Sequence, residues 1–200
     1  MSRRVMTTLT TVSTYLVQTL GSFYLAIVIL RFLLQLVRAD FYNPISVFIE
    51  NSTQLLINPI RSLLPPFRSF DIASLVVAIC IQWLIIQLTY VINGLGVVNV
   101  FIALSWGLVG ILSMLLNIYL YGLLATIIIS WVAPQSQHPA IILVKQLISP
   151  ALEPFRRILP SLGVIDLSPM ILFLVLNVLD YVIYGIATEI MLPAGIVAGI

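Results

Sequence analysis

Charged residues are scarce in this sequence. Only 8% of the 200 residues are Asp, Glu, Lys or Arg, whereas 61% are hydrophobic. Soluble domains have about 25% charged and about 45–50% apolar residues, and no soluble fold of this length could bury so much apolar surface. The solvent of this chain must therefore be lipid. The net charge of +2 is too small to indicate a nucleic-acid partner.

Cysteine and histidine are almost absent as well. The single cysteine, Cys80, excludes an intrachain disulfide, and the single histidine, His138, cannot supply both axial ligands of a haem within one copy of the chain. No cluster of His, Cys and carboxylates has metal-ligand spacing, and neither a phosphate-binding glycine loop nor a Ser/His/Asp set is evident. We therefore expect no cofactor, no metal site and no enzymatic activity.

Four long apolar runs are present instead, at roughly 15–37, 72–92, 97–132 and 167–192. Each reaches the ~20 residues that cross a bilayer, and helices are expected because each satisfies its own backbone hydrogen bonds in lipid. The third run would be about 54 Å long as a single helix, so a break near Asn117 is the alternative. Arg3 and Arg4 resemble the start of a signal peptide, but no clear small-residue cleavage site follows, and we expect a retained span.

The chain contains the same pattern twice, at a constant offset of 95 residues. The matching pairs are 59–65 with 154–160, Asp71 with Asp166, Pro44 with Pro139, and Gln82 with the amide Asn177. A duplication requires both halves to fold alike. We therefore assign residues 1–95 to repeat one and 96–200 to repeat two, each made of a helix, a basic segment and a helix.

The basic segments, at 40–70 and 134–165, decide the topology. Four spans place both on one side of the membrane, whereas five would place them on opposite sides. The positive-inside rule favours four, because basic residues lie in or beside each segment: Arg61 and Arg68 in the first with Arg38 just before it, and Lys145, Arg156 and Arg157 in the second. The predicted fold is an all-α integral membrane protein of two parallel repeats, with cytoplasmic basic segments and both termini outside. Arg3 and Arg4 argue for the reverse orientation.

Apolar residues recur at three- and four-residue steps in both basic segments, which predicts amphipathic helices. Since Pro59 and Pro154 interrupt this periodicity, we expect two short helices in each segment, lying in the membrane interface. Three roles are open for them: covering the end of the bundle, contacting anionic lipids, or docking a partner. The candidates for lipid or partner contacts are Arg68, Lys145 and Arg157.

An arginine and an aspartate recur with the same spacing in each repeat. Arg61 precedes Asp71 by ten residues, and Arg156 precedes Asp166 by ten. Each aspartate stands immediately before an apolar run, where its carboxylate could cap a helix. A cap alone, a cap combined with an Arg–Asp ion pair, and a transported-ion site are the three interpretations.

A few polar residues fall inside the apolar runs. Gln82 and Asn177 lie about 16 Å beyond the aspartate of their repeat, near the midplane, where we expect hydrogen bonds between helices. Asp180 lies about 21 Å from the same end, and an ionisable group at that depth is a functional hypothesis. Its natural partner is Arg31 of the first span. A neutral, protonated Asp180 and a functional Asp180 are the alternatives.

Several of these segments resemble the YggT family. They are Asp40-Phe41-Tyr42-Asn43-Pro44, the segments 59–65 and 154–160, and Ile165-Asp166-Leu167-Ser168-Pro169-Met170. The resemblance extends over nearly the whole chain and implies a small multi-pass protein of the bacterial inner membrane. It implies no settled activity: bacterial members are linked to osmotic and potassium balance and to the envelope or division, and plastid relatives to nucleoid organisation and assembly of a haem-bearing complex. Ser62 stands where repeat two has Arg157, so a double-arginine role would belong to repeat two.

The sequence thus predicts a non-enzymatic inner-membrane protein that acts by interaction, as an assembly, scaffold or envelope/osmotic-stress factor. Its expected partners are membrane lipids, with anionic lipids as candidates, and a membrane protein or a second copy of the chain, but not nucleic acid. The alternative is a small ion channel or transporter subunit with a polar path near Gln82, Asn177 and Asp180. A water-filled cavity that reaches Asp180 would favour transport.

Overall fold

A computed structural model describes residues 2–158 and 166–197, with side chains from residue 7 onward. The described residues form six helices: α1 (Ser2–Leu36), α2 (Pro44–Leu63), α3 (Ile72–Ile92), α4 (Val100–Val132), α5 (Pro139–Ile158) and α6 (Ser168–Glu189). The all-α prediction is confirmed. The end of the second basic segment, including Leu159 and Pro160 of the repeated motif, lies outside the described residues.

Four of the helices are long and apolar enough to cross a membrane: Thr7–Leu36, Ile72–Ile92, Val100–Val132 and Ser168–Glu189. The third is one uninterrupted helix, so the chain does not turn back near Asn117. The first begins well before the predicted residue 15. The threonines of this stretch are compatible with a helix, because a side chain such as that of Thr11 donates to the carbonyl of Thr7 one turn earlier.

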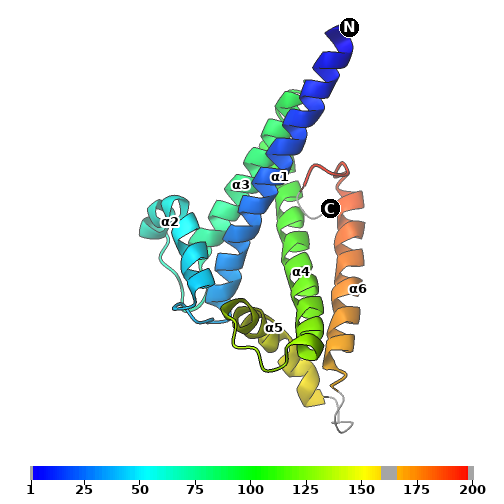
Figure 1. The fold of residues 1–200 in the computed structure, drawn as a ribbon. Helices are drawn as coiled ribbons and strands as arrows, with labels where there is room; N and C mark the ends of the chain where they lie inside the picture. The colour runs from blue at the N-terminus through cyan, green and yellow to red at the C-terminus, as the bar shows by residue number, and fades with distance from the viewer. Residues whose placement is uncertain (1, 159–165, 198–200) are drawn as a thin grey trace.

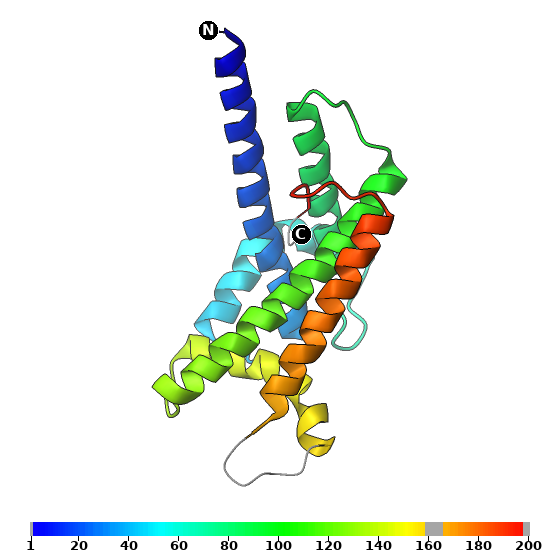
Figure 2. The same cartoon turned by 90° about the vertical axis from the view of Figure 1, so that its right-hand side faces the viewer.

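The helices run as two parallel repeats (Figure 1). α1 and α4 run in one direction and α3 and α6 return in the other, so α2 and α5 lie at the same end of the bundle. Turned by 90°, the molecule shows α4 and α6 side by side (Figure 2). The two basic segments also touch each other, since Asn43 Nδ2 donates to the Pro139 carbonyl at 2.8 Å. The charged end of the molecule is therefore built jointly by both repeats.

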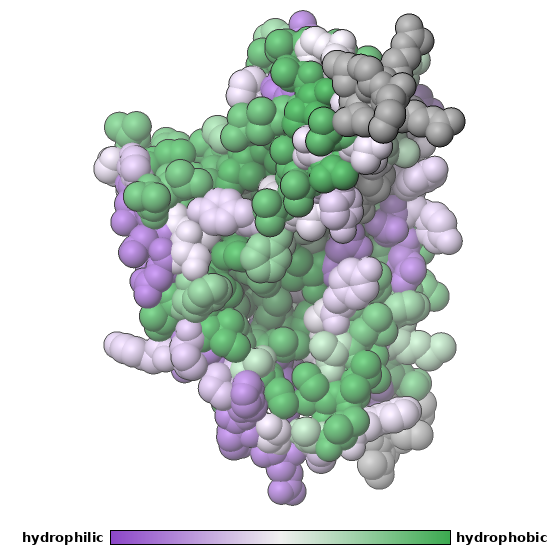
Figure 3. All heavy atoms as spheres, turned by 45° about the horizontal axis from the view of Figure 1, so that its top comes forward, coloured by the Kyte–Doolittle hydropathy of each residue, from purple (hydrophilic) through white to green (hydrophobic). Residues whose placement is uncertain are grey.

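One main apolar core joins the helices. It is centred on α1, and its buried residues come from all six helices: Leu25, Ile29, Leu33, Ile57, Val77, Leu123, Ile148, Leu152 and Leu172 among them. Close packing of α1 on α3 depends on Gly21, because a Cβ there would lie 2.6 Å from Ile85 Cγ1. Apolar side chains also cover much of the face drawn in Figure 3, as expected of a surface in contact with lipid.

The basic segments differ from the prediction of two short helices each. Pro59 lies inside α2, and Pro150 and Pro154 lie inside α5, yet each helix continues past its prolines. A proline removes one backbone hydrogen bond and bends a helix without necessarily ending it. In α2, the fully buried Ile57 and the partly buried Ile60 hold the chain against the core on both sides of Pro59. Tertiary packing therefore overrides the local break.

Candidate functional site

The Arg–Asp pair of repeat one is buried. The Asp71 carboxylate has no exposed surface; it accepts hydrogen bonds from the Arg61 guanidinium and, at 2.7 Å, from Ser74 Oγ. Arg61 also donates to Gln35 Oε1 at 3.1 Å. Asp71 occupies the N-cap position of α3, but its side chain makes no capping hydrogen bond. The expected cap is therefore wrong for Asp71, whose carboxylate faces the arginine instead.

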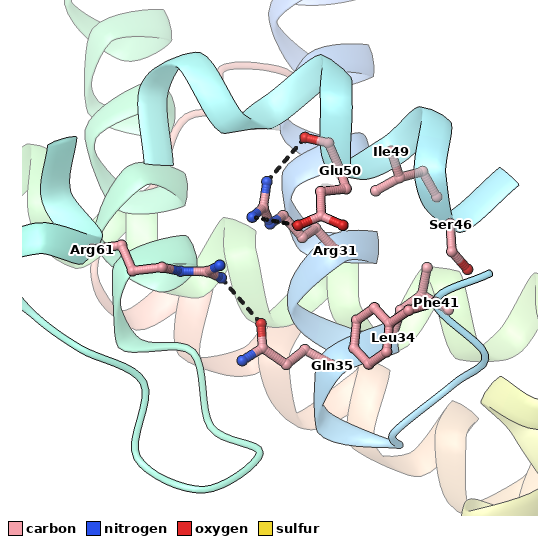
Figure 4. A pocket seen from close by; sticks show the side chains of 8 residues that line it. All are labelled: Arg31, Leu34, Gln35, Phe41, Ser46, Ile49, Glu50 and Arg61. Carbon is pink, nitrogen blue, oxygen red and sulfur yellow. Dashed lines mark hydrogen bonds and ion pairs between the residues drawn. The ribbon is translucent and has the colours of Figure 1, made fainter. Parts of the chain in front are cut away.

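A second arginine lies beside this pair. Arg31 is 6% exposed; its Nη1 donates to the Glu50 carbonyl at 3.0 Å and to Thr53 Oγ1 at 2.8 Å, and its Nη2 lies 3.6 Å from Glu50 Oε1. Arg31, Glu50, Gln35 and Arg61 line a cavity of about 180 Å³ between α1 and α2 (Figure 4). We call these four residues and Asp71 the repeat-one cluster.

The predicted partnership of Arg31 with Asp180 is wrong, because α2 lies along the end of α1 and brings Glu50 to Arg31. Glu50 was not predicted as a site residue. A signal for it exists: it is the one glutamate of the first basic segment, and repeat two has a lysine, Lys145, at the equivalent position.

The Arg–Asp pair of repeat two is exposed. Arg156 Nε lies 3.0 Å from Asp166 Oδ2, and both side chains are 44% exposed. Asp166 Oδ1 also accepts from the backbone N–H of Ser168 at 2.9 Å, at the start of α6. Desolvation acts to raise the pKa of Asp166, but the hydrogen bonds from Ser168 and Arg156 outweigh it, so that the pKa lies below its ordinary value. The ion pair is observed here, but the N-cap residue of α6 is Leu167, so Asp166 bonds the first N–H of the helix from the position before the cap.

A second cavity, of about 390 Å³, lies between the end of α4 and α5. Its lining residues are Thr126, Ser130, Pro134, Lys145, Ser149, Leu152 and Arg156. Four of these occupy the positions equivalent to Arg31, Gln35, Glu50 and Arg61, in the order Thr126, Ser130, Lys145 and Arg156, each 95 residues later. We call these four and Asp166 the repeat-two cluster. The duplication has preserved the cavity and changed its charges.

The intramembrane polar residues do not come together. Gln82 is fully buried against Gly107 of α4, and neither of its amide atoms has a hydrogen-bond partner among the described residues. Asn177 donates to the Phe173 carbonyl of its own helix at 2.7 Å, and Asp180 is exposed on α6. The predicted hydrogen bonds between helices are therefore wrong for both amides, and the three residues do not form a polar path.

Comparison with known proteins agrees with this duplicated architecture. The family model described as CCB3/YggT matches residues 10–92 and 105–187. The chain belongs to the CCB3/YggT family. The two ranges of the family match are themselves 95 residues apart, and they contain both clusters.

Relatives within the CCB3/YggT family align over most of their length. An uncharacterized protein of Pseudomonas aeruginosa is 46% identical over 176 residues, which is 88% of this chain and 89% of the relative. The YggT protein of Escherichia coli K12 is 37% identical over 171 residues, 84% of this chain and 86% of its own. A Vibrio alginolyticus protein is 34% identical over 172 residues, which is 84% of this chain and 90% of the relative. None of these names states an activity, and no solved structure matches.

The three residues predicted to contact lipid or a partner lie at the basic end of the bundle. Arg157 Nε lies 3.2 Å from Glu153 Oε1 and its side chain is 74% exposed. Arg68 is exposed, with its guanidinium 5.8 Å from the centroid of the Phe67 ring. Lys145 Nζ lies 3.4 Å from the Pro134 carbonyl. All three side chains are thus accessible or partly accessible from outside the bundle.

Proposed function

We propose that this protein is a non-enzymatic assembly or scaffold factor of the bacterial inner membrane that acts by binding another membrane protein. Its contribution to osmotic or envelope stress would then be indirect, through the complex that it helps to hold together. In this proposal the basic segments are interfacial helices on the cytoplasmic side. The family match and the four membrane helices support a multi-pass protein.

The observation that carries the proposal is a polar stripe along α6. It consists of Asn177, Asp180, Tyr181, Tyr184 and Thr188, which share one face of the helix by their spacing. Tyr181 is 77% exposed and Tyr184 is 65% exposed. Asp180 lies about 18 Å along the helix from Ser168, near the middle of a ~30 Å hydrocarbon core.

Polar groups at that depth are costly when they face lipid. Tyrosine, amide and carboxyl groups instead hold helices together through hydrogen bonds when a second helix covers them. The stripe therefore supports a binding face for a transmembrane helix that presents a donor to Asp180. A channel or transporter is less well supported, because its polar path would need Gln82, Asn177 and Asp180 together. Gln82 lies inside the bundle, whereas Asn177 and Asp180 lie on the stripe.

Site-specific photocrosslinking in living cells tests the proposal. A p-benzoyl-phenylalanine at Tyr181 should give a defined crosslinked adduct on illumination. The matched control is the same replacement at Val182, which is 53% exposed, lies at almost the same depth, and points about 100° around the helix. Equal adduct from the two positions, or none from either, would remove the support for a binding face on the stripe.

Thiol labelling tests the orientation. In a Cys80→Ser background, Arg68→Cys and Arg157→Cys should both resist a membrane-impermeant reagent in intact cells and react once the cells are opened. Labelling of both in intact cells would place the basic segments outside. Labelling of one alone would contradict the parallel arrangement.

A further inference from the structure

The two equivalent cavities differ in whether their charges cancel. In repeat one, Arg31 and Arg61 are matched by Glu50 and Asp71. In repeat two, Asp166 pairs with Arg156, and Lys145 has no ion-pair partner among the described residues. The repeat-one cluster is therefore neutral, whereas the repeat-two cluster retains one positive charge at the same place in the fold.

The exchange of residues explains this difference. Repeat one has a cation on its first helix, Arg31, and an anion on its basic helix, Glu50, and the two pair with each other. Repeat two has the uncharged Thr126 at the first position and Lys145 at the second. The carboxylate that completes the repeat-one cluster thus has no counterpart in repeat two, and an anion from outside the chain would take its role.

We propose that the repeat-two cavity binds a phosphate group, supplied by the headgroup of an anionic phospholipid or by free phosphate. Lys145 provides an ammonium, and Arg156 provides its terminal nitrogens, because its Nε is the atom held by Asp166. Ser149 adds a hydroxyl to the lining. Phosphate oxygens accept several such charge-assisted hydrogen bonds at once.

The shape and position of the cavity fit a lipid headgroup. Its volume of about 390 Å³ leaves room for a substituted phosphate, and the buried Leu152 gives it an apolar wall. It lies where the membrane-crossing α4 ends and α5 begins to cover the bundle. Thr126 and Ser130 donate to carbonyls of their own helix, at 2.8 Å and 2.6 Å, so the two cations and Ser149 supply the donors for the ligand.

Ligand-dependent thermal unfolding of the purified full chain in a neutral detergent tests this site. Phosphatidylglycerol should raise the unfolding temperature, and phosphatidylcholine with the same acyl chains should raise it less. Lys145→Gln should increase the half-saturating concentration of phosphatidylglycerol about tenfold, since one charge-assisted contact is lost. Arg38→Gln is the matched control: it removes an exposed cation of the first repeat that does not line the cavity, and should leave half-saturation unchanged.

A second variant and a second ligand complete the test. Thr126→Arg combined with Lys145→Glu rebuilds the internal pair of repeat one in repeat two and should abolish the response to phosphatidylglycerol. Inorganic phosphate, compared with chloride at equal ionic strength, identifies the source: a shift by phosphate that Lys145→Gln weakens supports the site with free phosphate as ligand. The proposal is overturned when neither phosphatidylglycerol nor phosphate distinguishes the wild type from Lys145→Gln.

Discussion

The two repeats place the same ion pair in opposite environments. The carboxylate of Asp71 has no exposed surface and the side chain of Arg61 is 28% exposed, whereas Arg156 and Asp166 are both 44% exposed. Around the first pair the chain supplies every charge that the cluster needs. Around the second it leaves a lysine unmatched beside a larger cavity. The comparison shows that both repeats keep the same scaffold. The charges of the repeat-one cluster are balanced within the chain, whereas the repeat-two cluster keeps an unpaired positive charge.

The cause lies in the packing of the return helices. α3 packs against α1, α2 and α4, so it lies inside the bundle, whereas α6 packs against α4 and α5 at the edge. Equivalent positions therefore lie in different surroundings, inside the bundle on α3 and at its surface on α6. Gln82 on α3 is fully buried, while its counterpart Asn177 is partly exposed on α6; the buried Ile85 corresponds to the exposed Asp180. Polar residues of α6 are consequently available to a partner.

The largest expected effect concerns the buried carboxylate. Asp71→Asn should lower the free energy of unfolding by about 3 kcal/mol or more, because it leaves a partly buried Arg61 without its counter-ion. Asp166→Asn should cost less than about 1 kcal/mol, because an exposed pair contributes little and an asparagine oxygen can still accept the hydrogen bond from the Ser168 N–H. Unfolding of both variants in detergent measures the difference, and comparable costs would contradict the contrast in burial.

An intermediate effect follows from exchanging the residues of the two cavities. Glu50→Lys places an ammonium beside Arg31, and since the Glu50 side chain is 49% exposed we expect a cost of about 1–2 kcal/mol. Lys145→Glu, the reciprocal exchange, should change stability by less than about 0.5 kcal/mol, because Lys145 has no ion-pair partner among the described residues. The same unfolding assay measures both. A large loss of stability in Lys145→Glu would contradict the conclusion that Lys145 has no partner within the chain.

The smallest effect is a dependence on pH in repeat two. The pKa of Asp166 lies below its ordinary value, because the hydrogen bonds from Ser168 and Arg156 outweigh desolvation. Its stabilisation should therefore be complete above about pH 4, the ordinary value for aspartate, and should be lost as the pH falls through the lower folded-state value. Wild type and Asp166→Asn should thus converge in acid. A difference that grows on acidification would contradict this assignment.

Much of the fold could be predicted because apolar run length and the 95-residue offset are strong signals. The second span was predicted at 72–92, and α3 is Ile72–Ile92. The clusters were only half predicted. The repeat identified Arg61, Asp71, Arg156 and Asp166 because both copies keep them. A search for residues kept in both copies could not identify Glu50, which is replaced by Lys145 in repeat two.

Burial was the other quantity that the sequence could not supply. Asp71 and Asp166 each follow an arginine by ten residues and precede an apolar run, and their exposure depends on which helices lie beside them. The predicted helix break at Pro59 was also wrong, because packing of the residues around the proline outweighs its local tendency to end a helix. Both misses arise from tertiary contacts rather than from the local pattern.

Parallel double-mutant cycles test the divergence of the repeats most directly. Each cycle combines an Arg→Gln and an Asp→Asn substitution, at Arg61 and Asp71 in one case and at Arg156 and Asp166 in the other, with thermodynamic stability as the readout. We predict a coupling of about 2 kcal/mol or more in repeat one and below about 1 kcal/mol in repeat two. Equal couplings in the two repeats would contradict the account.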